Sequence, residues 1–305
     1  MRVAVVDLGT NSTRLLVADV ADGVLTEVER RTDVTRLGEG VDATGELAPA
    51  AVERVFAALE RYRPAIAGAD VAVAVATSAV RDAANGAAFC AELGERFGLA
   101  ARAISGEEEA RLTFLGATDG RPADGETLVI DIGGGSTEYV TGVPGGPPAF
   151  HVSTRLGSVR QTERHLAHDP PLAAELAALA AEVRAVVEAE IPAAVRAGAT
   201  RGIACAGTAT SLAAIDQELD PYDSARVHGY ELTLAAAERM LAMLAALPVV
   251  ERRGVTGLLP ERAPTIVAGV VILVESMRLF GLDRVEVCEH DILHGAALEA
   301  ASGHP

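Results

Sequence analysis

Two short segments of the chain share the ungapped pattern D-x-G-x-x-S-T, and this internal repeat limits the folds open to the sequence. The first is "DLGTNST" at residues 7–13 and the second is "DIGGGST" at residues 131–137. Each lies between two strand-forming runs, so each predicts the tip of a β-hairpin whose first strand ends in an acid. A repeat at about the spacing of one domain predicts two copies of one fold facing each other.

The rest of the chain alternates strand-like and helix-like segments, which predicts an α/β fold. Apolar runs such as "VAVAVA" (71–76) and "TLVIDI" (127–132) indicate buried strands, whereas residues 172–197 form a long alanine-rich helical stretch. The turn-rich segment "DGRPADGE" (119–126) is typical of a domain boundary. We therefore expect one domain over residues 1–122 and another over 123–305, with the last helix able to pack back on the first domain.

Composition excludes several classes of protein. The 305 residues include no lysine, which rules out the P-loop lysine of nucleotide hydrolases and the Schiff-base lysine of pyridoxal enzymes. A formal net charge of −17 argues against nucleic acid as a partner, because such binding depends on cationic contacts to phosphates. The longest apolar stretch, at residues 266–274, is too short to span a bilayer, so no membrane partner is expected.

The cysteines point to a reducing compartment. Cys90, Cys205 and Cys288 are widely spaced, and the chain has no C-x-x-C motif. The N-terminal run "MRVAVVDLG" carries an acid where a secretion signal would be apolar. We expect reduced, mostly buried thiols in a cytoplasmic protein.

The glycine-rich loop of the second repeat favours an anion over a dinucleotide. A dinucleotide fingerprint opens a helix, but here the glycines are contiguous and β-branched residues follow, so the next element is a strand. Contiguous glycines expose backbone N–H groups to a bound anion. Asp131 and Glu138 on either side of the loop favour a hydrated divalent cation, Mg²⁺ or Mn²⁺. A wide turn without any ligand is the alternative.

The segment "ISGEEEARL" (104–112) holds a candidate general base. Ser105 and Glu108 have the spacing of a helix capping box, and Glu107 is expected in solvent. Glu109 falls on the largely uncharged helix face of Leu112, where burial would raise the pKa of its carboxyl group toward that of a general base. Acids that only complement the helix dipole are the alternative.

Three further segments carry polar patterns. In "ATSAVRDAAN" (76–85), hydroxyls and Arg81 at a strand-to-helix junction predict an anion site, with a simple helix cap as the alternative. "CAGTATSL" (205–212) repeats this plan, as a second phosphate loop or a cap. "HDILH" (290–294) has the histidine spacing of a zinc hydrolase, but its acid is a shorter aspartate and no third ligand is evident, which disfavours zinc.

Taken together, the paired hairpins, "ATSAVRDAAN", "ISGEEEARLTFLG", "VIDIGGGSTE" and "GTATSLAA" resemble the exopolyphosphatase/guanosine pentaphosphate phosphohydrolase (Ppx/GppA) family. The motifs occur in the family's order and cover nearly the whole chain. The resemblance implies two ribonuclease-H-like domains of the actin/sugar-kinase-like superfamily, flanking a central cleft, in the short two-domain form. It also implies a magnesium-dependent hydrolase that releases terminal phosphate from inorganic polyphosphate.

The resemblance assigns roles to particular residues. Glu109 matches the catalytic glutamate that activates water, and Arg81 matches the phosphate-binding arginine. Asp7 and Asp131 would face each other across the cleft and hold Mg²⁺ or Mn²⁺ together with Glu138. Asp131 is also expected to be a catalytic residue. The expected phosphate-binding residues are Gly9, Asn11, Ser12, Arg14, Thr77, Gly133, Gly134, Gly135, Ser136, Thr137, Gly207 and Thr208.

One segment departs from the family. Its usual "S-D-x-G-L-R-E-G" stands here as "CEHDILHGAAL", with His294 in place of the arginine, so no function is carried over to it.

Other functions stay open on the sequence alone. The charge of −17 opposes a polyanion unless arginines cluster at the site or magnesium coats the substrate, so guanosine pentaphosphate is the nearest rival substrate. A kinase of the same superfamily would need an adenosine pocket, for which no glycine motif is evident in the second half. A non-catalytic polyphosphate or alarmone sensor is a third candidate, and a homodimer is one candidate assembly.

Overall fold

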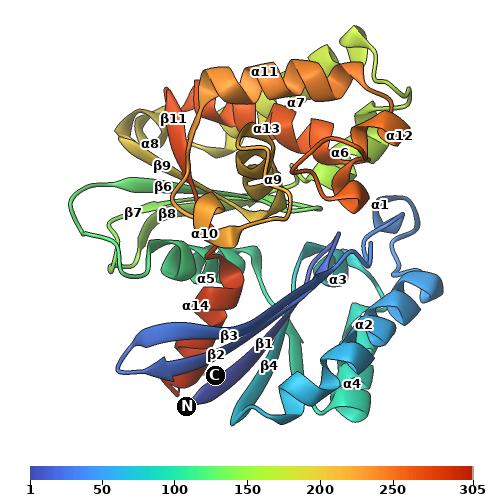
Figure 1. Ribbon diagram of the computed structural model, residues 1–305, viewed down its shortest axis with the longest axis vertical. Coiled ribbons are helices and arrows are strands. Elements are labelled where there is room, and N and C mark those ends of the chain that lie inside the picture. Colours follow the sequence, from blue (N-terminus) through green and yellow to red (C-terminus); the bar gives the residue numbers. More distant parts are fainter. Residues whose placement is uncertain (304–305) are drawn as a thin grey trace. The chain divides into compact units, whose positions relative to one another are not determined.

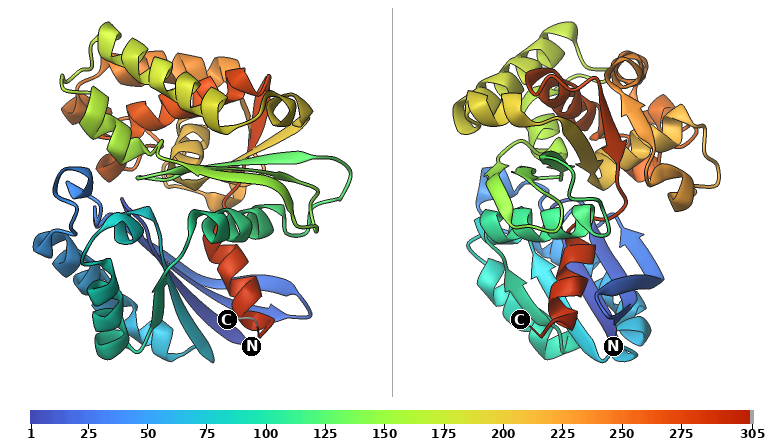
Figure 2. Two further views of the ribbon diagram at one scale, coloured as in Figure 1. Left: turned by 180° about the vertical axis from the view of Figure 1, so that it is seen from behind. Right: turned by 90° about the vertical axis from the view of Figure 1, so that its left-hand side faces the viewer.

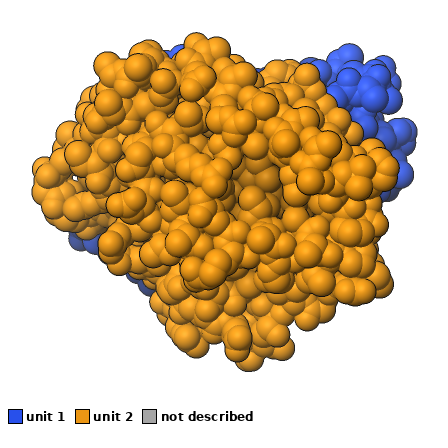
Figure 3. Space-filling view, turned by 90° about the horizontal axis from the view of Figure 1, so that it is seen from above, with its two compact units in different colours: residues 1–116, 292–305 blue, residues 117–291 orange. Residues whose placement is uncertain are grey.

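The computed structural model describes residues 1–303, which form two compact units (Figures 1 and 3). Unit 1 comprises residues 1–116 together with the segment that starts at Ile292, and unit 2 comprises residues 117–291. The boundary expected after residue 122 therefore lies inside unit 2, and the last helix belongs to unit 1.

Unit 1 is built on a five-stranded sheet in the order β3-β2-β1-β4-β5. The first three strands form an antiparallel meander, and β4 and β5 run parallel to β1. Val3 to Val6 are fully buried, so β1 lies at the centre with both of its faces covered. The strands are β1 (Arg2–Leu8), β2 (Thr13–Ala21), β3 (Val24–Asp33), β4 (Val71–Ala76) and β5 (Ala100–Ala103).

Helices cover both faces of this sheet, as Figures 1 and 2 show. On one face, α2 and α4 pack their apolar sides on the sheet around Phe56 and Leu59. On the other face, α5 and α14 enclose a smaller core that includes Leu112 and Leu293. The helices are α1 (Val41–Thr44), α2 (Pro49–Ala67), α3 (Ser78–Asp82), α4 (Gly86–Phe97), α5 (Gly106–Thr118) and α14 (Ile292–Ala301).

Unit 2 repeats the topology of unit 1. Its sheet has the order β10-β11-β9-β6-β7-β8, in which β6, β7 and β8 form an antiparallel meander and β9 and β11 run parallel to β6. Only β10 is additional, and it pairs antiparallel with β11. The strands are β6 (Thr127–Ile132), β7 (Thr137–Gly142), β8 (Pro148–Thr154), β9 (Arg201–Cys205), β10 (Glu231–Thr233) and β11 (Arg284–Val287). The expected pair of ribonuclease-H-like units in an α/β protein is confirmed.

A helical layer buries one face of the second sheet, and α13 (Ile266–Leu279) lies at its centre. This helix contains the apolar stretch at 266–274 and is buried on all sides, which explains why it is apolar all round. No helix of the described residues is long and apolar enough to cross a membrane. The other helices are α6 (Ser158–His165), α7 (Ala173–Glu190), α8 (Ala193–Gly198), α9 (Ala206–Asp216), α10 (Ser224–Val227), α11 (Leu234–Ala246), α12 (Val249–Arg252) and the 3-10 helix η1 (Pro260–Arg262).

Candidate active site

The two repeat segments form hairpin tips with the same backbone hydrogen bond. In unit 1 the N–H group of Gly9 donates to the carbonyl oxygen of Ser12 at 3.0 Å. In unit 2 the N–H group of Gly133 donates to the carbonyl oxygen of Ser136, also at 3.0 Å. A Cβ atom at either glycine would stand 3.1 to 3.2 Å from that carbonyl oxygen, so glycine gives each turn the room it needs. The sequence repeat is therefore a repeat of local structure.

The two hairpins differ in the charge that faces the acid. Asp7 pairs across the strands with Arg14, whose Nε and Nη2 atoms lie 2.8 and 2.6 Å from Asp7 Oδ2. At the equivalent position of unit 2, Asp131 pairs with Glu138. Asp131 is 7% and Glu138 2% exposed, so two buried acids occupy opposite positions on neighbouring strands. Such a pairing of like charges is unfavourable unless a cation or a proton offsets it.

The start of α6 fixes the orientation of the second loop. Main-chain and side-chain N–H groups of residues 158–160 donate to the carbonyl oxygens of Gly133, Gly134 and Gly135 at 2.8 to 3.2 Å. In a planar trans peptide the N–H group points opposite to the carbonyl. The N–H groups of residues 134–136 therefore point away from α6, which gives the loop one side lined by donors, as an anion site requires.

Gly157 makes this contact between helix and loop possible. A Cβ atom at this position would stand 2.2 Å from Gly134 O and 2.3 Å from the carbonyl carbon of Gly135. The side chain of Thr137 also holds the loop, because its hydroxyl donates to the carbonyl oxygen of Leu156 and is fully buried. In the structure Thr137, expected to bind phosphate, thus serves to anchor the loop.

In unit 1 the junction of β4 and α3 gathers hydroxyls and a guanidinium group. Thr77 precedes α3 and is buried, and the hydroxyls of Ser78 and Thr10 lie 2.9 Å apart. Thr10 belongs to the hairpin tip of unit 1, so this hydrogen bond joins the two predicted anion-binding segments. Thr10 was not among the predicted site residues, although it lies inside the repeat.

Arg81, in α3, connects this junction to Glu109 by a hydrogen bond. Its Nη1 atom donates to Glu109 Oε2 and to the carbonyl oxygen of Ile104, both at 3.0 Å. Glu109 is 7% exposed, whereas Glu107 on the same helix is exposed, as the helical spacing predicted. The predicted cap is also present, because the N–H group of Glu108 donates to Ser105 Oγ at 3.1 Å.

Burial dominates the electrostatics of Glu109. It raises the pKa of the carboxyl group to about 7, against the opposing effect of Arg81 and with a smaller contribution from the charge of Asp7. A carboxyl group with this pKa exchanges a proton near neutral pH, which a general base requires. Unit 1 thus brings together four predicted residues, Asp7, Arg14, Arg81 and Glu109.

The β9–α9 junction of unit 2 holds Gly207 and Thr208. A Cβ atom at Gly207 would stand 0.9 Å from Arg262 Nη1, so the guanidinium group lies directly against the start of α9. Arg262, which belongs to η1, was not among the predicted site residues. The sequence signal for it is weak: an arginine shortly before the apolar helix α13. Thr208 is 4% exposed and packs closely against Gly269 of α13, which fits a structural role better than ligand contact.

The "HDILH" segment (290–294) is divided between the units. His290 belongs to unit 2, where its ring stacks on His228 at 4.4 Å between centroids, and His294 lies in α14 of unit 1. Within residues 1–303, no group of three or more His, Cys, Asp or Glu side chains is arranged to hold a metal ion.

Comparison with known proteins now decides the family. The model of the Ppx/GppA phosphatase family matches residues 16–304. The chain belongs to this family. Exopolyphosphatase 2 of Mycobacterium tuberculosis is 38% identical over 316 residues, covering 98% of each chain. The crystal structure of the Aquifex aeolicus family member has 30% identity and a TM-score of 0.84 and covers 99% of this chain and 98% of its own. An exopolyphosphatase-like protein of known structure has 33% identity and a TM-score of 0.92, with 98% and 97% covered.

Proposed function

We propose that this member of the Ppx/GppA family is an exopolyphosphatase-type hydrolase that releases the terminal phosphate of inorganic polyphosphate with Glu109 as general base. The observation that carries the proposal is a buried carboxyl group with a pKa of about 7, held 3.0 Å from the guanidinium group of Arg81. Full-length relatives that are named exopolyphosphatases support the substrate class.

In the proposed mechanism, Arg81 of unit 1 binds the terminal phosphoryl group. The donor side of the 134–136 loop is proposed separately, as a phosphate-binding element of unit 2. Ionised Glu109 accepts a proton from water as the water oxygen attacks the terminal phosphorus. The bond from this phosphorus to the bridging oxygen breaks, and the shortened chain leaves as a phosphate anion. Such a reaction depends mainly on positioning and charge neutralisation, which fits a carboxyl group held beside the guanidinium group of Arg81.

The donor set of unit 2 fits magnesium. Asp131 and Glu138 supply oxygen ligands from paired strands, and Mg²⁺ is commonly held by one or two carboxylates together with substrate phosphates. When bound, the ion would neutralise charge on the phosphate oxygens. Asp7, which accepts hydrogen bonds from Arg14, is the other acid predicted to bind the ion.

Magnesium binding can be tested without any turnover. Glu138→Gln should weaken Mn²⁺ binding, measured by electron paramagnetic resonance as loss of the free-ion signal. Asp124→Asn, which removes an exposed carboxylate of the same unit, is the matched control. Equal Mn²⁺ affinity in Glu138→Gln and the control would remove Glu138 from the proposed metal site.

A phosphate-release assay with magnesium tests the function. Polyphosphate, guanosine pentaphosphate and ATP are compared as substrates, using the intact protein, Glu109→Gln and the matched control Glu107→Gln on the same helix. We expect release from polyphosphate, a loss of about 10²–10⁴-fold in Glu109→Gln, and little change in Glu107→Gln.

Other outcomes of the phosphate-release assay would contradict the proposal or favour an alternative function. An active Glu109→Gln protein would overturn the role of Glu109. Release from guanosine pentaphosphate alone would favour the alarmone hydrolase, and ADP formation that requires a second substrate would favour a kinase. Polyphosphate binding without release would favour a sensor.

A further inference from the structure

Two of the three cysteines end neighbouring strands of unit 2. Cys205 is the last residue of β9, and Cys288 directly follows β11. The strands are parallel, with Val287 opposite Ala204, so the next residue of each strand is a cysteine. The N–H group of Cys288 donates to Ala204 O at 2.9 Å, which continues the pairing to this point. Adjacent strands lie about 4.8 Å apart, within the range of about 4.4–6.8 Å between Cα atoms of a disulfide.

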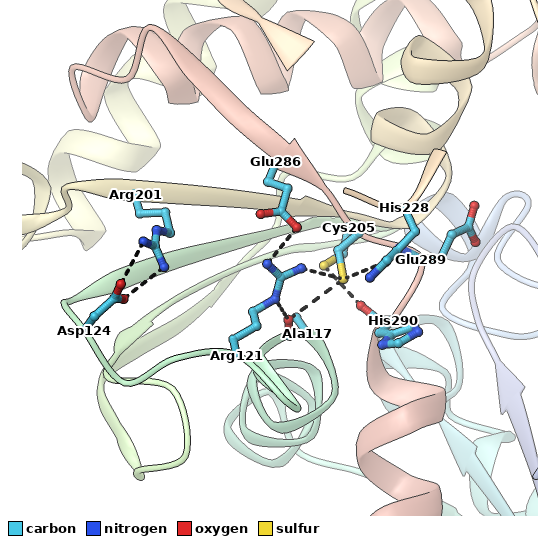
Figure 4. A network of polar contacts seen from close by, with 10 residues as sticks. Ala117, Arg121, Asp124, Arg201, Cys205, His228, Glu286, Glu289 and His290 are labelled. Atoms are coloured by element: carbon cyan, nitrogen blue, oxygen red, sulfur yellow. Dashed lines mark hydrogen bonds and ion pairs between the residues drawn. The ribbon is translucent and has the colours of Figure 1, made fainter. Parts of the chain in front are cut away.

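Two nitrogen atoms lie close to the sulfur of Cys288, one from Arg121 and one from His228, and Figure 4 shows both of these side chains beside Cys205. Arg121 Nη2 lies 3.6 Å and His228 Nδ1 3.8 Å from Cys288 Sγ. The thiol of Cys205, on the neighbouring strand, donates to the carbonyl oxygen of His290 at 3.5 Å. Glu286 holds the guanidinium group of Arg121 by an ion pair of 2.6 Å. The cationic guanidinium group of Arg121 beside this sulfur favours the thiolate.

The electrostatics agree with this geometry. The thiol of Cys205, then His228 and Arg121, hold the pKa of Cys288 well below its ordinary value despite burial. In contrast, burial raises the pKa of Cys90, which lies in unit 1 and is half-buried.

Solvent has little access to Cys205 and Cys288. Cys205 is 0% and Cys288 1% exposed, but the side chain of Arg121 is 15% and that of Glu286 30% exposed. The sulfur of Cys288 thus lies directly beneath a partly exposed ion pair. We therefore expect a small uncharged oxidant such as hydrogen peroxide to reach this sulfur, and a bulky aromatic thiol reagent to react first with Cys90, which is partly exposed.

We propose that Cys205 and Cys288 form an oxidative modification site, in which Cys288 reacts with a hydroperoxide and Cys205 resolves the product to a disulfide. The assignment is independent of the proposed hydrolase function. Closure would tie the end of β11 to the residue that precedes α9, where Ala206 has a φ of 61° and Gly207 lies against Arg262.

The two steps balance with hydrogen peroxide as the two-electron oxidant. The Cys288 thiolate attacks one peroxide oxygen, so that an S–O bond forms and the O–O bond breaks, and the departing hydroxide takes up a proton to become water. The Cys205 sulfur then attacks the sulfenic sulfur; an S–S bond forms, the S–O bond breaks, and hydroxide leaves with the Cys205 proton as a second water. Two thiols are oxidised and one peroxide is reduced to two waters.

Mass spectrometry of the intact folded protein tests the proposal. After treatment with a few equivalents of hydrogen peroxide, we expect loss of two hydrogens, reversed by dithiothreitol, with the Cys205–Cys288 link found by peptide mapping without reduction. Cys90→Ser, the matched control, should behave the same. Oxidation of Cys90 before the pair, or products that are only intermolecular, would overturn the proposal.

Further variants separate the two roles. Cys205→Ser should stop at a gain of one oxygen that dimedone traps on Cys288, and Cys288→Ser should resist the same peroxide dose. Arg121→Met keeps both thiols and should slow disulfide formation severalfold. Oxidation of Arg121→Met at the rate of the unaltered protein, or no dimedone adduct in Cys205→Ser, would also overturn the assignment.

Discussion

Replacing Glu109 by glutamine should make the protein more stable at alkaline pH. The pKa of Glu109 is about 7 in the folded protein, against an ordinary value of 4.5. The unfolded chain therefore releases this proton at a lower pH than the folded chain does. Between pH 4.5 and 7 the folded state binds more protons, so the contribution of Glu109 to stability falls as the pH rises and levels off above about 7.

The size of the effect follows from the two pKa values. Each pKa unit corresponds to about 1.4 kcal/mol, so ionisation of Glu109 costs the folded state about 3 kcal/mol at pH 8 compared with pH 4. Glutamine resembles the protonated acid and avoids this cost. The difference in unfolding free energy between Glu109→Gln and the unaltered protein should thus shift by about 3 kcal/mol in favour of the variant from pH 4 to pH 8. Comparing two pH values cancels changes in packing and in the contact with Arg81.

Urea unfolding followed by circular dichroism gives the measurement, since the chain contains no tryptophan. Curves are recorded at several pH values between 4 and 8 for both proteins and for Glu107→Gln. The exposed control should stay within about 0.5 kcal/mol of the unaltered protein. A difference between Glu109→Gln and the unaltered protein that does not change with pH would refute the argument that burial raises the pKa of Glu109.

Two other predictions follow from the site. The rate constant kcat/KM for polyphosphate should rise with pH and reach a plateau above about 7, the pKa of Glu109. Arg81→Met should move this rising part of the pH–rate profile to higher pH, because Arg81 lowers the pKa of Glu109. A profile that does not move in Arg81→Met would contradict the assignment. Gly157→Ala should lower the unfolding free energy by about 1–3 kcal/mol and weaken phosphate binding measured by calorimetry. The reason is that the new methyl group would stand 2.2 Å from the backbone of residues 134–135. An unchanged midpoint of urea unfolding would show that the loop can shift without cost.

The sequence predicted the features that depend on local pattern. The repeat around Asp7 and Asp131 predicted two hairpins, and helical spacing placed Glu109 on the buried face of α5. These predictions succeed because strand alternation and helix period determine which side of an element faces inward.

The features that the sequence left unseen depend on contacts between distant segments. The donation of residues 158–160 to the loop at 133–135 and the contact of Arg262 with Gly207 join parts of the chain whose spacing has no periodic signature. The unit boundary was expected at the turn-rich segment 119–126, but α5 carries the chain of unit 1 up to residue 116. Turn composition marks where a chain bends, whereas a unit boundary depends on which side chains pack together.

The division of unit 1 into two chain segments has a consequence for synthesis. Residues 292–303 complete the core that covers Val3 and Val5, so this face of β1 stays open until α14 has left the ribosome. At typical elongation rates, the interval between residues 116 and 297 is roughly 10–40 s. Unit 2 is continuous and ends at residue 291, so all of its residues are synthesised before those of α14. Nascent chains that end at Asp291 should therefore be cleaved by proteases in the first 116 residues sooner than in unit 2.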